Sequence, residues 1–152
     1  MISLLVMIKI EYPAYQYKIE QKDNKEVIFD IVRRQWVSLI PEEWVRQNFL
    51  QYLIQVKQYP PSLISVEKEI YLGELKKRCD IVIYNTNGQP YIIVECKAMD
   101  VDLNTSTVEQ ILRYNISMPV QYLIITNGSY CFAFERSNNH FDVLSAIPGW
   151  QG

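Results

Sequence analysis

The chain opens with a pattern typical of paired strands. Residues 15–20 and 25–32 are interpreted as two strands on either side of the polar turn Lys22-Asp23-Asn24. A turn of this composition between two strands predicts an N-terminal hairpin over about 12–32.

The period changes to a helical one after Ile40. Pro41 suits the first position of a helix, and the acidic pair Glu42-Glu43 favours the positive end of the helix dipole. Apolar residues then recur every three or four positions along one face, at Val45, Phe49, Leu53 and Val56. The pattern predicts an amphipathic helix that ends before Pro60-Pro61.

The rest of the chain returns mostly to strands. Gly73 to Lys77 is interpreted as a turn, Asn87-Gly88 is a strong hairpin signal, and Asn104 is one of several caps for a second helix. We predict strands at 63–71, 80–84, 91–97, 120–126 and 130–135, and a helix at 107–117. This order of elements indicates the α/β class, with a mixed central sheet flanked by helices.

Length and composition are those of a folded domain. The chain has 152 residues, of which 49% are hydrophobic and 21% charged, and no linker or repeat divides it. We expect a single domain over 1–152, with a core over about 29–136 and a short C-terminal tail. The net charge of −2 argues against a surface that is basic throughout, so binding to nucleic acid would need a local patch such as Lys76, Lys77 and Arg78.

The cysteines and the apolar stretches exclude several classes. Three cysteines without a paired spacing argue against both a disulfide framework and a zinc site, and they indicate the cytoplasm. The short apolar stretch over 1–10 lacks the features of a signal peptide, and no apolar run is long enough to cross a membrane. The single histidine, His140, has no evident partner and is given no role.

The hairpin around Asn87-Gly88 carries the candidate chemistry. Centred there, it puts Asp80 opposite Glu95, and Lys97 lies two residues further along the same face. Two facing carboxylates repel each other unless a cation lies between them, and oxygen ligands suit magnesium. The same geometry is equally consistent with a structural cluster in which Lys97 only neutralises Glu95.

Other polar and thiol groups near this hairpin have two readings each. The same register puts Cys79 opposite Cys96 on the reverse face, where we expect two buried thiols rather than a disulfide. The basic run from Lys76 to Arg78 would either hold phosphates near the site or form a solvated turn. Glu69 would either approach the site or form a surface ion pair.

Several ordered strings resemble a known family. Asp80 followed by Glu95-Cys96-Lys97 resembles the PD-(D/E)XK nuclease superfamily, and Gln110 with Tyr114 resembles the Gln-x-x-x-Tyr motif of some of its branches. Four strings occur in the order found in the N-terminal nuclease domain of type I restriction enzyme R subunits: Pro41 to Gln47, Arg78 to Val82, Glu95 to Ala98, and Thr126 to Gly128. The resemblance covers about 29–134.

The resemblance implies a restriction-endonuclease-like core and magnesium-dependent hydrolysis of DNA, with Mn²⁺ as a substitute. Asp80 and Glu95 would bind the metal, together with the backbone carbonyl of Cys96. Lys97 would be the catalytic lysine, and Gln110 would orient Lys97, water or DNA. Tyr114 would pack or contact the DNA backbone, and the basic run 76–78 would add DNA contacts.

Many superfamily members also use an acidic residue on the first helix. Glu42 is the candidate metal ligand and Glu43 the second choice, because the apolar positions of that helix turn this end toward the sheet. Stabilisation of the helix end explains both residues equally well.

Two departures from the family leave alternatives open. Cys79 stands where the motif has its proline, and no Gly-x-x-x-x-Gly-Lys-Ser/Thr phosphate loop occurs, so we expect no motor in this chain. The expected partners are DNA and the motor, specificity or modification subunits of a restriction system. The alternatives are a catalytically silent module for DNA binding or assembly, and an unrelated α/β protein.

Overall fold

The computed structural model describes residues 5–152, without the side chain of Leu72. Its helices are α1 (Pro41–Gln51) and α2 (Thr105–Asn115), with a π-helical turn at Tyr52–Val56 after α1 and a 3₁₀ turn at Pro61–Leu63. Its strands are β1 (Ile8–Lys9), β2 (Ile19–Lys22), β3 (Lys25–Asp30), β4 (Gln35–Ser38), β5 (Ile64–Leu72), β6 (Leu75–Tyr84), β7 (Pro90–Cys96), β8 (Tyr122–Thr126), β9 (Tyr130–Ser137) and β10 (His140–Leu144).

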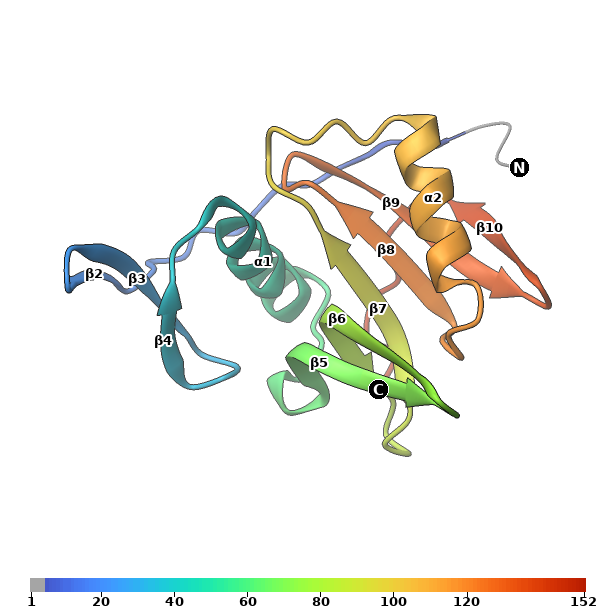
Figure 1. Ribbon diagram of the computed structural model, residues 1–152, viewed down its shortest axis with the longest axis horizontal. Coiled ribbons are helices and arrows are strands. Elements are labelled where there is room, and N and C mark those ends of the chain that lie inside the picture. The colour runs from blue at the N-terminus through green and yellow to red at the C-terminus, as the bar shows by residue number, and fades with distance from the viewer. Residues whose placement is uncertain (1–4) are drawn as a thin grey trace.

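A mixed sheet forms the centre of the molecule (Figure 1). Its strand order is β1-β9-β8-β7-β6-β5, and β10 also pairs with β9. The pairing of β7 with β8 is parallel, and the other pairs of this sheet are antiparallel. The connection from β7 to β8 contains α2, as a parallel crossover requires. The predicted α/β class is confirmed.

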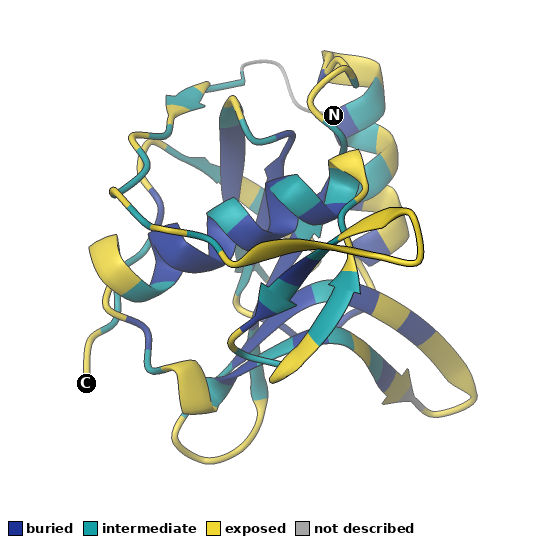
Figure 2. Ribbon diagram, turned by 90° about the vertical axis from the view of Figure 1, so that its left-hand side faces the viewer, coloured by how far each residue is buried: buried dark blue, intermediate teal, exposed yellow. Residues whose placement is uncertain are grey.

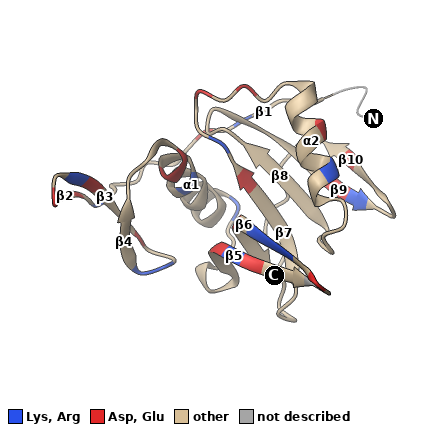
Figure 3. Cartoon of the chain, in the orientation of Figure 1, with Lys and Arg blue, Asp and Glu red and all other residues tan. Residues whose placement is uncertain are grey.

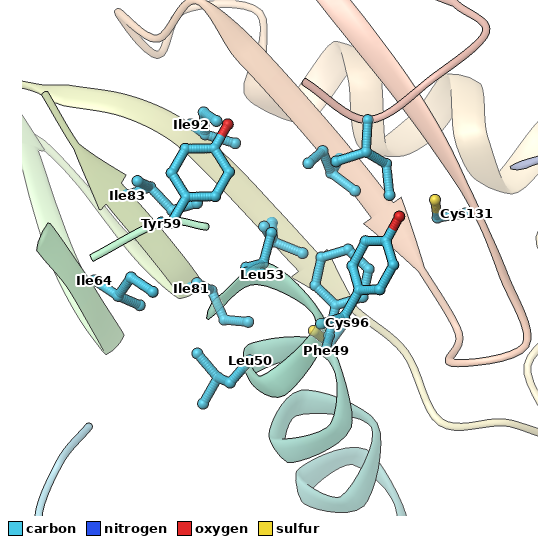
Figure 4. Close-up of a cluster of buried hydrophobic side chains, with 14 of the residues drawn as sticks. Phe49, Leu50, Leu53, Tyr59, Ile64, Ile81, Ile83, Ile92, Cys96 and Cys131 are labelled. Atoms are coloured by element: carbon cyan, nitrogen blue, oxygen red, sulfur yellow. The ribbon is translucent and has the colours of Figure 1, made fainter. Parts of the chain in front are cut away.

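Each face of the sheet carries a separate apolar core. We call the core under α1 the α1-side core; it is built on Phe49, Leu50 and Leu53 against Ile81, Ile83 and Ile92 (Figure 4). We call the core under α2 the α2-side core; it contains Val108 and Leu112 with Val82, Ile93 and Leu123. The predicted face of the first helix is thus confirmed up to Leu53, while Val56 is 45% exposed because the π-helical turn rotates it outward.

Both helix starts follow the local sequence rules. Pro41 begins α1, and no side chain caps that end. Asn104 caps α2, because its side-chain oxygen accepts a hydrogen bond from the Thr107 amide at 2.9 Å. In both cases the predicted cap or start residue is confirmed.

A second sheet projects from the body beside α1. It contains β2, β3 and β4, and its β2–β3 end is largely exposed (Figure 2). The predicted hairpin is confirmed around Asp23 and Asn24, both at positive φ, but its first strand begins at Ile19 and not at residue 15. The rings of Tyr15 and Tyr17 instead stack edge to face near Trp44, which removes that segment from the ladder. The β4 strand was not predicted.

Strands β5 and β6 form a longer hairpin than predicted. Leu72 pairs with Leu75 across a two-residue turn in which Gly73 has a φ of +61°. The predicted turn over 73–77 is therefore wrong beyond residue 74, since a glycine at positive φ closes the hairpin at once. Lys76, Lys77 and Arg78 consequently lie within β6.

The β6–β7 hairpin has the predicted register in its central part. Ile81 pairs with Val94 and Ile83 with Ile92, while the register shifts by one beyond Ile83, near the turn. Because the shift lies at the turn end, it does not alter the pairing next to the candidate site. No helix within residues 5–152 combines the length and apolar character that crossing a bilayer demands.

Candidate active site

The candidate residues lie where β6 leaves β7. The β6–β7 ladder reaches only to Ile81 and Val94, whereas β6 remains paired with β5 as far as Leu75. The β5–β6 hairpin thus diverges from the sheet beyond Ile81, and Figure 1 shows this fork. Asp80 on β6 and Glu95 on β7 are the next residues beyond the last pair of this ladder. Lys97 follows β7, and its backbone amide donates a hydrogen bond to the Thr126 carbonyl at 2.8 Å.

At this fork, the alternation of side chains along β6 changes, so that residues two apart no longer pack on the same face of the sheet. Ile81 belongs to the α1-side core, but Cys79, two residues away, belongs to the α2-side core. On the neighbouring strand, Val66 and Ile70 are divided in the same way, and Glu67 between them has a φ of +52°. A non-glycine residue in this region is strained, and such outliers often mark functional sites. The exchange turns Asp80 toward α1.

Asp80 is bound through both of its carboxylate oxygens. Oδ2 accepts a hydrogen bond from the Cys96 amide at 2.8 Å, and Oδ1 accepts one from Arg46 Nη2 at 2.8 Å. The first bond ties β6 to the end of β7 where the ladder has stopped. The second links the fork to α1.

Arg46 is the centre of a buried charge network. Only 5% of it is exposed, and its Nη1 lies 2.6 Å from Glu43 and 3.3 Å from Glu67. Burial alone would lower the pKa of Arg46, but the hydrogen bond to Asp80 and the charge of Glu43 outweigh burial and raise this pKa. The network continues from Glu43 to Arg33, Asp30 and Gln47. These ion pairs fix the position of α1 against the fork, although the buried Nε of Arg46 has no hydrogen-bond partner.

Glu95 has a different environment. Its side chain is 13% exposed, and Lys77 Nζ lies 2.9 Å from Oε1. Apart from this ion pair, Oε1 is buried without a hydrogen-bond partner. Burial raises the pKa of Glu95, the nearby Lys77 lowers it in part, and the charge of Asp80 raises it further.

Glu95 opens onto a cavity of about 270 Å³ on the α2 side of the sheet. The walls include Lys77 and Lys97 from the strands, and Gln110, Tyr114 and Asn115 from α2. Lys77 Nζ lies 4.1 Å from the centre of the Tyr114 ring. The cavity thus contains the predicted catalytic lysine, the predicted orienting glutamine and one predicted metal ligand.

The two acidic residues that begin α1 have separate surroundings. Burial raises the pKa of Glu42, and the neighbouring charge of Asp80 raises it further, while Arg46 and Lys97 lower it. Glu42 therefore lies within electrostatic reach of both Asp80 and Lys97. Glu43 is buried between Arg33 and Arg46 and faces the charge network instead. Of the two, Glu42 is the one beside the candidate site.

Two details of the predicted hairpin are wrong. The contacts of Asp80 lie with α1 and those of Glu95 with the α2-side cavity, so the two carboxylates do not simply share a face. Cys79 and Cys96 lie in different cores and do not face each other, although both are free buried thiols as expected. The face exchange in β6, between Cys79 and Ile81, accounts for both errors.

The basic run 76–78 also divides between two sides. Lys77 is only 8% exposed against Glu95, whereas Lys76 and Arg78 are exposed and pair with Glu69 and Glu67. Figure 3 shows the acidic and basic residues side by side on β5 and β6. Glu69 therefore has the surface ion pair that was one of its two readings.

Sequence reasoning assigned no role to Arg46, Arg33, Asp30 or Asn115. The position of Arg46 four residues after Glu42 was a signal for a helical ion pair, and the two lie 3.6 Å apart. Nothing in the sequence indicated that Arg46 would also reach Asp80, 34 residues away.

The oxygen chemistry of the fork fits a hard divalent cation. As the side chains stand, no three acidic, histidine or cysteine residues within 5–152 are gathered tightly enough to hold a metal ion. The buried Oε1 of Glu95 nevertheless has only the Lys77 ammonium beside it and no hydrogen bond, and carboxylate oxygens are the ligands that Mg²⁺ prefers. Asp80 and Glu95 could hold such an ion if it displaced Arg46 from Asp80 or Lys77 from Glu95.

The mixed sheet and the site at its fork define a restriction-endonuclease-like α/β domain. The family model described as type I restriction enzyme R protein N terminus (HSDR_N) matches residues 41–148. The chain therefore belongs to this family, and the resemblance noted in the sequence is confirmed.

A solved structure is also similar to this chain. It is a protein from Anabaena variabilis ATCC 29413, described as a candidate nuclease belonging to DUF820. The likeness has a TM-score of 0.46 at 12% sequence identity and covers 88% of this chain and 80% of that one. None of the curated proteins matches the chain.

Proposed function

We propose that this domain is a Mg²⁺-dependent deoxyribonuclease that cuts phosphodiester bonds within DNA, with Mn²⁺ able to substitute. The observation that carries the proposal is the Glu95 carboxylate, whose buried Oε1 has no hydrogen bond. A buried carboxylate needs a cation, and Lys77 at 2.9 Å supplies one here. A divalent ion that took its place would lie on the same cavity as Lys97.

The proposed ligands of the cation are Asp80 and Glu95, with the Cys96 carbonyl and Glu42 completing the oxygen set. A bound Mg²⁺ ion would activate water and neutralise charge that develops on the phosphate. Arg46 must then share Asp80 with this cation, since it now binds Oδ1 at 2.8 Å.

The remaining side chains would bind and orient. Lys97 stands close enough to both Glu95 and Glu42 to affect their pKa values, so its ammonium can stabilise the negative charge of the reacting phosphate. Gln110 lines the same cavity from α2 and would orient Lys97, water or DNA. Tyr114 is 70% exposed and can contact the DNA backbone.

The family description supports the proposed partners. DNA is the substrate, and motor, specificity or modification subunits of a type I restriction system are the protein partners we propose. The net charge of the chain is −2, and the exposed Lys76 and Arg78 of β6 are paired with glutamates, so a DNA contact would be local.

A catalytically silent binding or assembly module is the second candidate. It is favoured by Asp80, whose two oxygens already accept hydrogen bonds from Cys96 and Arg46. In that case the charges at the fork would serve only to hold β6, β7 and α1 together.

A calorimetric titration with Mn²⁺ distinguishes the nuclease from the silent module. The nuclease proposal expects saturable binding that Asp80→Asn or Glu95→Gln weakens strongly, and nicking of supercoiled plasmid in the same buffer. The silent module expects neither. Lys76→Gln is the matched control, because Lys76 is exposed and paired with Glu69.

A further inference from the structure

Lys77 occupies an unusual position for a lysine. It is 8% exposed and lies between Glu95 on β7 and the Tyr114 ring on α2. Lysine is rarely buried unless it is paired, and this pairing is with a proposed metal ligand. The ammonium is thus within 2.9 Å of the oxygen that a cation would approach.

The pairing with Glu95 is incomplete. The ion pair is short, but Glu95 Oε1 accepts no hydrogen bond. A second acceptor on the same cavity, Asn115 Oδ1, is also buried without a donor. Native interiors rarely leave such acceptors unsatisfied, so this cavity is arranged for a further polar or cationic ligand.

The cavity carries more positive than negative charge. Lys77 and Lys97 line it together, and Glu95 is the acidic residue on its wall. A cation bound by Glu95 would repel both ammonium groups and leave their charge for an anion. Lys77 itself is buried, while the Tyr114 side chain that its ammonium faces is 70% exposed.

We propose that Lys77 is a second phosphate-binding lysine, which is paired with Glu95 until a metal ion binds. In the free protein its ammonium neutralises Glu95 at the position of the metal. When a divalent cation binds Glu95, Lys77 is displaced into the cavity and contacts the DNA phosphate beside Lys97. The inference rests on the proposed nuclease function and extends it, because it makes one DNA contact depend on the metal.

The dependence of DNA affinity on salt tests this directly. Each lysine that contacts a phosphate contributes about 0.9 to the slope of log K against log[salt]. In a Lys97→Ala background, which prevents cutting, a labelled duplex is titrated by fluorescence anisotropy in Mg²⁺ and in EDTA. We expect Lys77→Met to reduce the slope by about one contact in Mg²⁺ and to leave it unchanged in EDTA.

Lys76→Met is the matched control for this titration. Lys76 is the preceding residue, is 58% exposed and pairs with Glu69 away from the cavity. Its effect on the slope should be the same with and without metal. An equal effect of Lys77→Met in both buffers, or no effect in either, would overturn the proposal.

Affinity for metal in the absence of DNA gives a second readout. Lys77→Met removes a competing cation, so Mn²⁺ should bind about tenfold tighter than to the wild type, the equivalent of one pKa unit. Lys77→Arg pairs more firmly with a carboxylate and should weaken Mn²⁺ binding, which keeps the test valid should the methionine variant fail to fold.

The outcomes separate this inference from the proposed function. Suppose that the wild type binds Mn²⁺ and nicks DNA, and that both Lys77 variants bind Mn²⁺ with unchanged affinity. This result would overturn the proposed role of Lys77 alone. Protein that binds no Mn²⁺, as wild type or as Lys77→Met, would overturn both.

Discussion

The two carboxylates at the fork have opposite surroundings. Asp80, on the α1 side, has both oxygens hydrogen-bonded and shares its arginine with Glu43 and Glu67. Glu95, on the α2 side, is paired with one lysine, has a buried oxygen with no hydrogen bond, and lines a cavity.

This difference separates a carboxylate whose oxygens both accept hydrogen bonds from the protein from one that is paired with a single lysine. Charges that are fully paired and buried stabilise a single arrangement, and removing one partner is costly. A carboxylate that is buried but incompletely paired is ready for a ligand. In the free protein the α1 side therefore holds the fork in shape, and the α2 side is the side from which a ligand can reach Glu95.

The largest effect is expected when Arg46 is replaced by methionine. The change leaves Asp80 and Glu43 without their main cation in a buried site, and it should lower the free energy of unfolding by about 3–5 kcal/mol. Urea unfolding followed by circular dichroism measures this. Arg113→Met, on the exposed face of α2, is the control and should change stability little. A loss of equal size in both variants would contradict the contrast between the two sides.

A smaller effect is expected when Lys77 is replaced by methionine. In EDTA, the loss of its pairing with Glu95 should cost about 1–2 kcal/mol of stability. Added Mn²⁺ should recover that loss, because a cation again neutralises Glu95. It should recover only part of the loss in Arg46→Met, because the ion would neutralise Asp80 but not Glu43. The measurement is the thermal midpoint with and without Mn²⁺. Full recovery of both variants, or recovery of neither, would mean that the two sides do not differ as described.

The smallest effect concerns the acid sensitivity of the charge network. The hydrogen bond from Arg78 lowers the pKa of Glu67 from its ordinary value of 4.5, although partial burial opposes this. The folded protein then favours the ionised form, so the contribution of Glu67 to stability is present above pH 4.5 and is lost as pH falls through the lowered pKa. We expect Glu67→Gln to differ from the wild type most at neutral pH and progressively less in acid.

The control for this pH dependence is Arg78→Gln, which removes the main cause of the shift in the pKa of Glu67. In that background, the dependence of the Glu67→Gln difference on pH should be weaker. Chemical unfolding at a series of pH values provides the comparison. A difference that grows as the pH falls would show the opposite sign and would contradict the ion-pair network.

The sequence was sufficient for the elements whose signals are local. The helical spacing from Val45 to Leu53, the Asn104 cap and the Asn87-Gly88 turn depend on neighbouring residues, and the structure confirms each of them. The register of β6 on β7 followed from that turn because hairpin pairing is fixed by its loop.

The site could be predicted only as far as β6 and β7 keep the regular pairing of a hairpin. The face exchange in β6 coincides with a positive φ at Glu67, and no glycine signals it in the sequence. The link from Arg46 to Asp80 joins distant parts of the chain, and Lys77 was assigned to a turn because the early closure at Gly73 was missed. Each of these features depends on tertiary geometry that local patterns do not encode.

The most direct test of the proposed function is nicking of supercoiled plasmid in Mg²⁺ or Mn²⁺, comparing the wild type with Lys97→Ala and Asp80→Ala. We expect the wild type to nick the plasmid, and each substitution to reduce the rate by at least about a hundredfold, as loss of a group that stabilises the transition state does. Circular dichroism would establish that both variants are folded. Wild-type protein that binds either metal yet leaves the plasmid intact, or nicking that survives both substitutions, would contradict a nuclease site at the fork.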